Sequence, residues 1–139
     1  MAEEVQFFQH GNTTVLDHSI RVAEKSLKIA EKLHLKVNVE SMIRGALLHD
    51  YFLYDWHDRS VRPRFHGFRH PALALRNAVR DFHLNAIERN IIIRHMFPLT
   101  IIPPLFIESW IVCIADKYSA LEETRIFRRL SSFVLGRTA

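Results

Sequence analysis

The segment from Thr13 to His34 repeats its apolar side chains with the period of an α-helix, and it constrains the fold more than any other feature. Apolar residues recur every three or four positions along it: Leu16, Ile20, Ala23, Leu27 and Ala30. Charged residues such as Glu24 and Lys28 fall on the opposite side, as on an amphipathic helix that covers a core. No stretch of the sequence alternates apolar and polar residues for long enough to indicate a strand. An all-α fold is therefore predicted.

Later segments favour helices as well. They cover Val39 to about Leu53, a helix opened by His70-Pro71, Asn85 to about Met96, a long helix from after Pro104 through Ala120, and a last one around Arg125–Val134. Between the second and third helices, the Tyr54–Arg69 stretch breaks the period and predicts a polar loop. The 139 residues suit one domain. We expect a compact bundle of about six helices over residues 1–139.

Composition narrows the class of protein. A single cysteine, Cys113, excludes an internal disulfide, and the start MAEEVQFFQHGNTT lacks the basic and apolar regions of a signal peptide. The most apolar stretch, Ile91–Ala115, is interrupted by charged residues and prolines, so it does not predict a membrane span. The net charge of +4 is a modest basic excess without a recognition-helix motif. We expect a cytoplasmic protein that binds neither membranes nor nucleic acid.

Several titratable residues stand in apolar helical surroundings. They are His18, the pair His49-Asp50, His70, His95 and Asp116. Taken singly, a histidine on an apolar face is more often a hydrogen-bonded core residue, and a lone aspartate is usually a cap or an ion-pair partner. A buried carboxylate is costly unless it pairs or binds a metal, and imidazole with carboxylate suits Zn, Fe or Mn. One shared metal centre explains all of these positions at once.

The order and local context of these residues resemble the HD superfamily of metal-dependent phosphohydrolases, including small bacterial members. The matching segments are LDHSIRVAE, GALLHDYFLYDW, RHPALALRNA, IIIRHMFP and CIADKYSALEE, which place the ligand-bearing core at about residues 10–123. The resemblance implies one metal held by His18, His49, Asp50 and Asp116. It implies a second held by His70 and His95, with Asp50 bridging the two. The implied cofactors are one or two divalent ions, drawn from Fe, Mn, Zn, Ni, Co or Mg.

The same resemblance implies hydrolysis of a phosphomonoester or phosphodiester, a nucleotide among them, by a metal-activated water. Two specific activities of the superfamily are not implied. No GYP segment follows His95, as it does in the cyclic-dinucleotide phosphodiesterases, and Leu53 and Tyr54 replace the Glu-Asp pair of the stringent-response hydrolases. Two alternatives stay open: a di-iron oxygenase of HD type, and a module that senses a nucleotide without turnover.

Further candidates surround this centre. Arginines suit bidentate recognition of phosphate, and the Tyr54–Arg69 loop supplies Arg59, Arg62, Arg64 and Arg69, although a solvated basic loop would have the same composition. His66 is a candidate proton donor or a support for a metal ligand, and His10 could contact a phosphate oxygen. With Asp50, we assign catalytic roles to His66 and to Lys117, which could neutralise substrate, orient Asp116 or extend to water.

Overall fold

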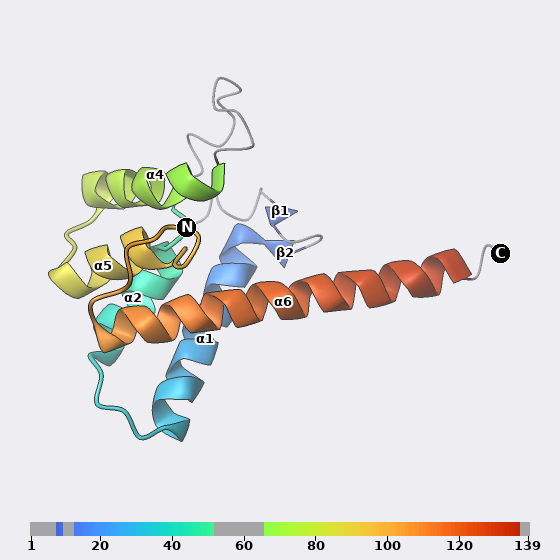
Figure 1. Cartoon of the computed structure of the whole chain (residues 1–139), viewed down its shortest axis with the longest axis horizontal. Helices are drawn as coiled ribbons and strands as arrows, with labels where there is room; N and C mark the ends of the chain where they lie inside the picture. The colour runs from blue at the N-terminus through green and yellow to red at the C-terminus, as the bar shows by residue number, and fades with distance from the viewer. Residues whose placement is uncertain (1–7, 10–12, 52–65, 137–139) are drawn as a thin grey trace.

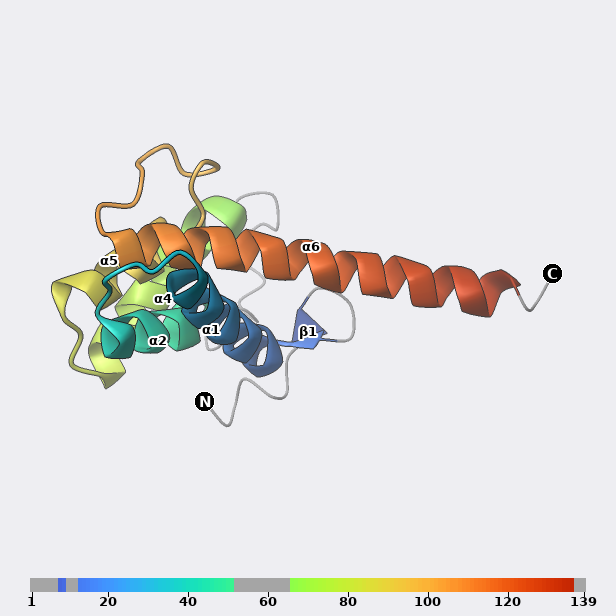
Figure 2. The same ribbon diagram turned by 90° about the horizontal axis from the view of Figure 1, so that it is seen from below.

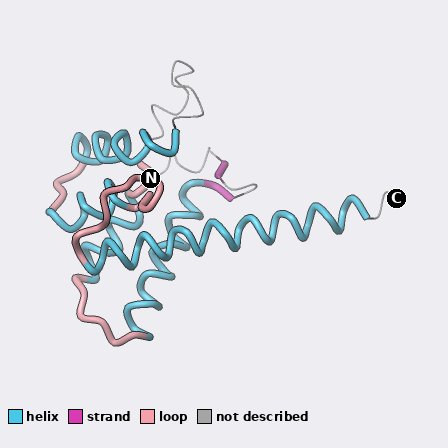
Figure 3. Tube along the Cα trace, viewed as in Figure 1, coloured by secondary structure: helices cyan, strands magenta, loops and turns pink. Residues whose placement is uncertain are grey.

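The computed structural model describes residues 8–9, 13–51 and 66–136, with side chains from 15–51 and 70–136. Its elements are β1 (Phe8–Gln9), β2 (Thr13–Thr14), α1 (Val15–Lys32), α2 (Val39–Leu48), α4 (His66–Asp81), α5 (Ala86–Arg94) and α6 (Ile107–Gly136). The prediction of an all-α fold is confirmed, with five helices in the described part of the chain (Figures 1 and 3). The two short strands pair antiparallel, Phe8 opposite Thr14, and form only a small ribbon before α1.

The helices form a bundle around one main core. Helix α1 packs against α2 and α6, α5 packs against α2 and α6, and α4 covers α5 (Figure 2). The core side chains come from four of these helices and include Val22, Met42, Ala46, Ile91 and Val112, all fully buried. The N-terminal half of α6 lies in this bundle, whereas its C-terminal half extends away from it (Figure 1). None of the described helices is both long and apolar enough to cross a bilayer.

Two of the helix starts follow the local sequence signals. Asn38 caps α2 by accepting from the backbone N–H of Ser41, as an N-cap residue does. Asn85 and Glu88 form a capping box at the start of α5, where each side chain accepts from the backbone N–H of the other residue. Both predicted starts are confirmed, and these caps fix where α2 and α5 begin.

The predicted end of the second helix was wrong. Helix α2 stops at Leu48 rather than about Leu53, because the N–H of Tyr51 donates to the carbonyl of Leu48 and tightens the last turn. His49 becomes the C-cap of α2 instead of an interior position. The His49-Asp50 pair therefore lies at the end of a helix, where the chain turns.

Two other boundaries differ from prediction. Helix α4 begins at His66, four residues before the predicted start, and it includes Pro71 within its second turn. The segments predicted to end at Ala120 and to restart at Arg125 form one continuous helix, α6. No Gly or Pro separates them, and the Thr124 hydroxyl donates to the Ala120 carbonyl within the helix. Local sequence provided no reason for α6 to stop.

Candidate metal centre

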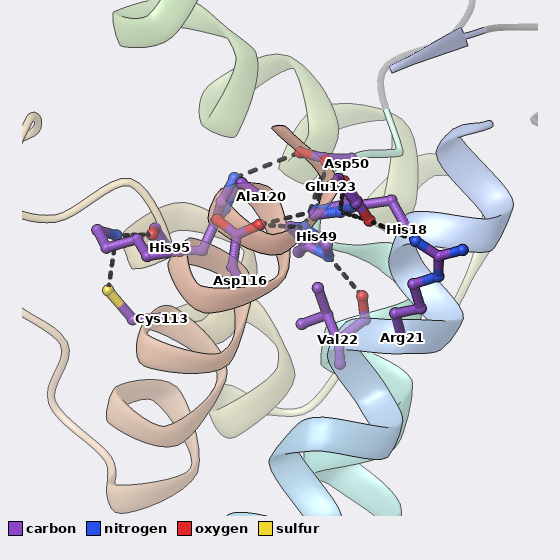
Figure 4. A network of polar contacts seen from close by, with 12 residues as sticks. His18, Arg21, Val22, His49, Asp50, His95, Cys113, Asp116, Ala120 and Glu123 are labelled. Atoms are coloured by element: carbon purple, nitrogen blue, oxygen red, sulfur yellow. Dashed lines mark hydrogen bonds and ion pairs between the residues drawn. The ribbon is translucent and has the colours of Figure 1, made fainter. Parts of the chain in front are cut away.

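The structure brings together the six residues that sequence predicted as metal ligands. His18 comes from α1, His49 and Asp50 follow α2, His70 lies on α4, His95 follows α5, and Asp116 lies on α6. All are buried except Asp116, which is half-buried. Figure 4 labels five of them from close by: His18, His49, Asp50, His95 and Asp116. Each of the five described helices thus contributes to one cluster.

Asp50 lies between two sets of histidines. Its Oδ1 is 3.2 Å from Nε2 of His70 and 3.4 Å from Nε2 of His95. Its Oδ2 is 3.2 Å from Nε2 of His49 and 4.0 Å from Nε2 of His18. A carboxylate that presents one oxygen to each of two groups of imidazoles has the arrangement that a bridging ligand requires.

Asp116 completes the group on the His18 side. Its Oδ1 is 2.8 Å from Nε2 of His18 and 3.4 Å from Nε2 of His49. Two triads have ligand atoms within 4.8 Å of one another, namely His18, His49 and Asp116, and His49, Asp50 and His95. The Nε2 atoms of His70 and His95 also face each other at 2.8 Å. The two halves of the cluster are therefore continuous, with His49 and Asp50 between them.

In three of the histidines, the ring nitrogen Nδ1, on the side away from the cluster, donates a hydrogen bond to a carbonyl or carboxylate oxygen. Nδ1 of His49 donates to the Ala46 carbonyl at 2.5 Å, and Nδ1 of His95 donates to the Ile92 carbonyl at 2.7 Å. Both carbonyls belong to the last turn of a helix, where they have no intrahelical partner. With Nδ1 fixed as a donor, Nε2 of each ring is directed at the cluster, as in histidines that bind metals.

Glu123 performs this role for His18, and sequence reasoning missed it. Nδ1 of His18 donates to the Glu123 carboxylate, whose two oxygens both lie 3.1 Å away, and Arg21 lies 3.6 Å from the same carboxylate. Glu123 is buried on α6 two helical turns beyond Asp116. That seven-residue spacing, which places both carboxylates on one helix face, was the available signal.

The charges of the cluster are strongly coupled. Burial lowers the pKa of His18, but hydrogen bonds to Asp116 and Glu123 outweigh it and raise the pKa to about 9. Burial likewise opposes the charge of His49, yet Asp50 and Asp116 raise its pKa well above its usual value. Burial raises the pKa of Asp50 and Asp116, whereas neighbouring histidines hold both well below their usual range. The positive charges favoured on His18 and His49 thus balance the negative charges of Asp50 and Asp116. Bound metal cations would balance the same carboxylates.

The residues present fit a divalent metal. Nε2 of His49 is fully buried and makes no hydrogen bond among the described residues, although two carboxylate oxygens lie within 3.4 Å of it. Buried polar atoms in proteins normally have a partner. Imidazole nitrogens and carboxylate oxygens form a donor set for ions such as Zn²⁺, Fe²⁺ and Mn²⁺. A cation among these atoms would supply the missing partner.

The other predicted site residues are less fully described. Lys117 donates from Nζ to the His95 carbonyl at 2.9 Å and lies 3.2 Å from Sγ of Cys113. It therefore supports the backbone of a predicted ligand. His66 and Arg69 lie at the start of α4, but their side chains are outside the described residues. Also outside them are His10, Arg59, Arg62 and Arg64.

Comparison with known proteins agrees with this arrangement. The family model described as HD domain matches residues 15–121, which include all six clustered residues. No curated protein and no solved structure matches the chain. Glu123 lies just beyond the matched segment. Because the match covers most of the sequence and carries the clustered His and Asp residues, this chain belongs to the HD domain family.

Proposed function

We propose that this protein is a metal-dependent phosphohydrolase that cleaves a phosphomonoester or phosphodiester, with nucleotides among its substrates. Membership of the HD domain family supports the reaction class. The observation that carries the proposal is the position of Asp50, whose two oxygens face separate pairs of histidines. Such a carboxylate suits a site for two cations about 3.5–4 Å apart, as in many phosphoesterases.

In this proposal the first ion would be held by His18, His49, Asp50 and Asp116. The second would be held by His70, His95 and Asp50. When bound, such ions supply a water of lowered pKa as the nucleophile and neutralise charge on the phosphate. The four histidines contribute as neutral ligands, and the two aspartates contribute the negative charge that balances the ions.

The remaining groups serve to position substrate and ligands. The hydrogen bond from Lys117 to the His95 carbonyl holds the end of α5 near α6. We assign recognition of the substrate phosphate to Arg59, Arg62, Arg64, Arg69 and His10, and delivery of a proton to the leaving group to His66. These assignments rest on the chemistry of the side chains. The expected partner is a small phosphorylated molecule.

The proposal is tested by loading the purified protein with Mn²⁺, Fe²⁺, Zn²⁺, Ni²⁺, Co²⁺ or Mg²⁺ in turn. Phosphate release from a panel of nucleotides, sugar phosphates and phosphodiesters is then measured. Activity with at least one ion and one substrate is expected, with a loss of at least 100-fold in His49→Ala. The exposed His83 provides the control, because His83→Ala leaves the cluster unchanged.

Four results would contradict the proposal. The first is no hydrolysis of any phosphoester by fully loaded protein, and the second is full activity in His49→Ala. The third is bound iron with consumption of O₂ and no phosphate release, which would identify an oxygenase. A nucleotide that raises the melting temperature without being converted would instead indicate a sensing module.

A further inference from the structure

Helix α6 carries a second apolar face on the side away from the core. This face, here named the outer stripe, consists of Ile107, Trp110, Ile114, Tyr118 and Leu121, each between 40 and 57% exposed. The opposite side of the same turns packs into the bundle through residues such as Val112 and Ala115, which are fully buried. The N-terminal half of α6 is therefore apolar on both sides, which is typical of a helix buried on both sides.

The loop before α6 extends this surface. Its exposed apolar residues are Leu99, Ile101, Ile102 and Leu105, between 47 and 87% exposed. The ring of Phe97 contacts the edge of Trp110 at a centroid distance of 5.4 Å, which ties the loop to the outer stripe. Figures 1 and 2 both show this loop beside the start of α6.

Over residues 99–115 this surface has no exposed charge. Between residues 99 and 115 the only charged residue is Glu108, which is buried and accepts from the N–H of Asn38. In the whole chain 24% of the residues are charged. Depletion of charge around exposed aromatic and aliphatic side chains is characteristic of the centre of a protein–protein interface.

The area is sufficient for a stable interface. Nine large side chains that are 40 to 87% exposed present on the order of 1,000 Å² in total. The largest apolar patch on a typical monomer is about 300–600 Å². A standard interface buries about 800 Å² on each partner. The exposed area of the outer stripe and its loop is therefore larger than the usual apolar patch of a monomer. It is also large enough for one side of a standard interface.

The spacing of the outer stripe is symmetric. Its members stand seven and four residues before Ile114 and four and seven residues after it. In an antiparallel pair of α6 helices related by a two-fold axis at Ile114, Trp110 faces Tyr118 of the partner subunit. Ile107 likewise faces Leu121 of the partner subunit. A two-fold interface requires a surface that is complementary to itself, and this pattern meets that condition.

We propose that the outer stripe of α6 binds a second copy of this chain in an antiparallel, two-fold symmetric dimer centred on Ile114. Charged residues at the edge of the stripe would form the polar rim of this interface. Lys25 lies over the ring of Tyr118, 5.0 Å from its centroid, and its Nζ is 2.5 Å from a carboxylate oxygen of Glu122. A bilayer would also accept an exposed apolar helix face. It has no requirement for symmetric spacing, however, so the symmetry favours a second copy.

The mass of the full-length protein in solution is the first test. Light scattering after size exclusion should give twice the 16.3 kDa of one chain at micromolar concentrations. Ile114→Arg would place two cations together at the two-fold axis and should raise the dissociation constant at least about 100-fold. Leu130→Arg is the matched control, because Leu130 is an equally exposed residue of α6 outside the stripe. It should leave the mass unchanged.

A cross-linking test holds even if Ile114→Arg does not fold. Ile114→Cys places two thiols at the axis, and mild oxidation should join the chains. In Leu121→Cys the two thiols would lie about 21 Å apart along the helices, so oxidation should leave the chains separate. The native Cys113 is buried and is present in both variants, so any cross-linking through it would be the same in the two.

Either of two results would overturn the proposal. One is a monomeric mass at 100 µM together with equal cross-linking of the two cysteine variants. The other is monomeric protein that sediments with vesicles of phosphatidylcholine and one-third phosphatidylserine and loses this binding in Ile114→Arg, which would assign the stripe to a membrane surface.

Discussion

Glu123 accepts a hydrogen bond from Nδ1 of His18, and this contact orients one imidazole of the cluster from the far end of its ring. The same imidazole meets Asp116 through Nε2. Asp116 and Glu123 therefore hold both nitrogens of His18 from a single face of α6. The carboxylate of Glu123 also raises the basicity of the ring, which strengthens Nε2 as a ligand.

The first prediction is that Glu123→Gln weakens metal binding without unfolding the protein. The amide keeps the size of the side chain but removes its charge, so a 10- to 100-fold loss of affinity for Mn²⁺ is expected. Titration calorimetry measures it. Glu122→Gln is the control, because the neighbouring Glu122 pairs with Lys25 at the surface. Equal affinity in the two variants would remove Glu123 from the site.

The second prediction concerns the number of ions. Elemental analysis of loaded wild-type protein should find close to two ions per chain and close to one in His70→Ala. Asp50→Asn should retain fewer than one, because Asp50 contacts both sets of histidines. The control is His83→Ala, which alters an exposed histidine. One ion per chain, unchanged in His70→Ala, would show that His70 and His95 are not ligands.

The third prediction concerns the close packing of α2 against α5. A Cβ at Gly45 would lie 2.5 Å from Cδ1 of Ile91 and 2.9 Å from its Cβ. Gly45→Ala should therefore lower the free energy of unfolding by about 1–3 kcal/mol, as measured in urea. Gly136→Ala is the control, because nothing lies within 4 Å of a Cβ there. If Gly45→Ala were as stable as the wild type, the two helices would have to separate easily.

The fourth prediction is a pH dependence of stability through Asp81. Its carboxylate accepts from Arg80 and from the hydroxyl of Tyr51, and these bonds lower its pKa from 3.8 to about 2. Because the folded-state pKa is the lower one, the contribution of Asp81 is present above about pH 4 and is lost as the pH falls to 2.

Asp81→Asn measures this contribution. The difference in unfolding free energy between the wild type and the variant should be constant from pH 5 to 7. It should shrink at pH 3, because the Asp81 carboxyl is largely protonated in the unfolded chain at that pH and part of the stabilisation of the folded state is lost. Urea titrations at each pH provide the values. A difference that is the same at pH 3 and pH 6 would show that the Arg80 and Tyr51 contacts do not hold the charge of Asp81.

Sequence was informative about the cluster because the ligands are chemically conspicuous. His49 and His95 each follow an apolar helical run, and Asp116 stands among small apolar neighbours. Polar groups in such positions need partners, so each signals a buried site before any contact is known. The helical period and the start of the second helix at Val39 likewise depend only on neighbours within a few residues, and both were predicted correctly.

Other features depend on contacts that no local pattern contains. The two oxygens of Asp50 face different histidines only because α1, α4 and α5 converge on the turn after α2. Glu123 reaches His18 across 105 positions of sequence.

The sequence by itself thus determined the helical class, the family resemblance and the set of side chains available to a metal, since these follow from periodicity and from the cost of burying polar groups. Only the tertiary structure decided which nitrogen meets which oxygen, and which carboxylate supports His18. Those contacts are set by the packing of helices far apart in the chain. Spacing within one helix specifies a face, but not what that face meets.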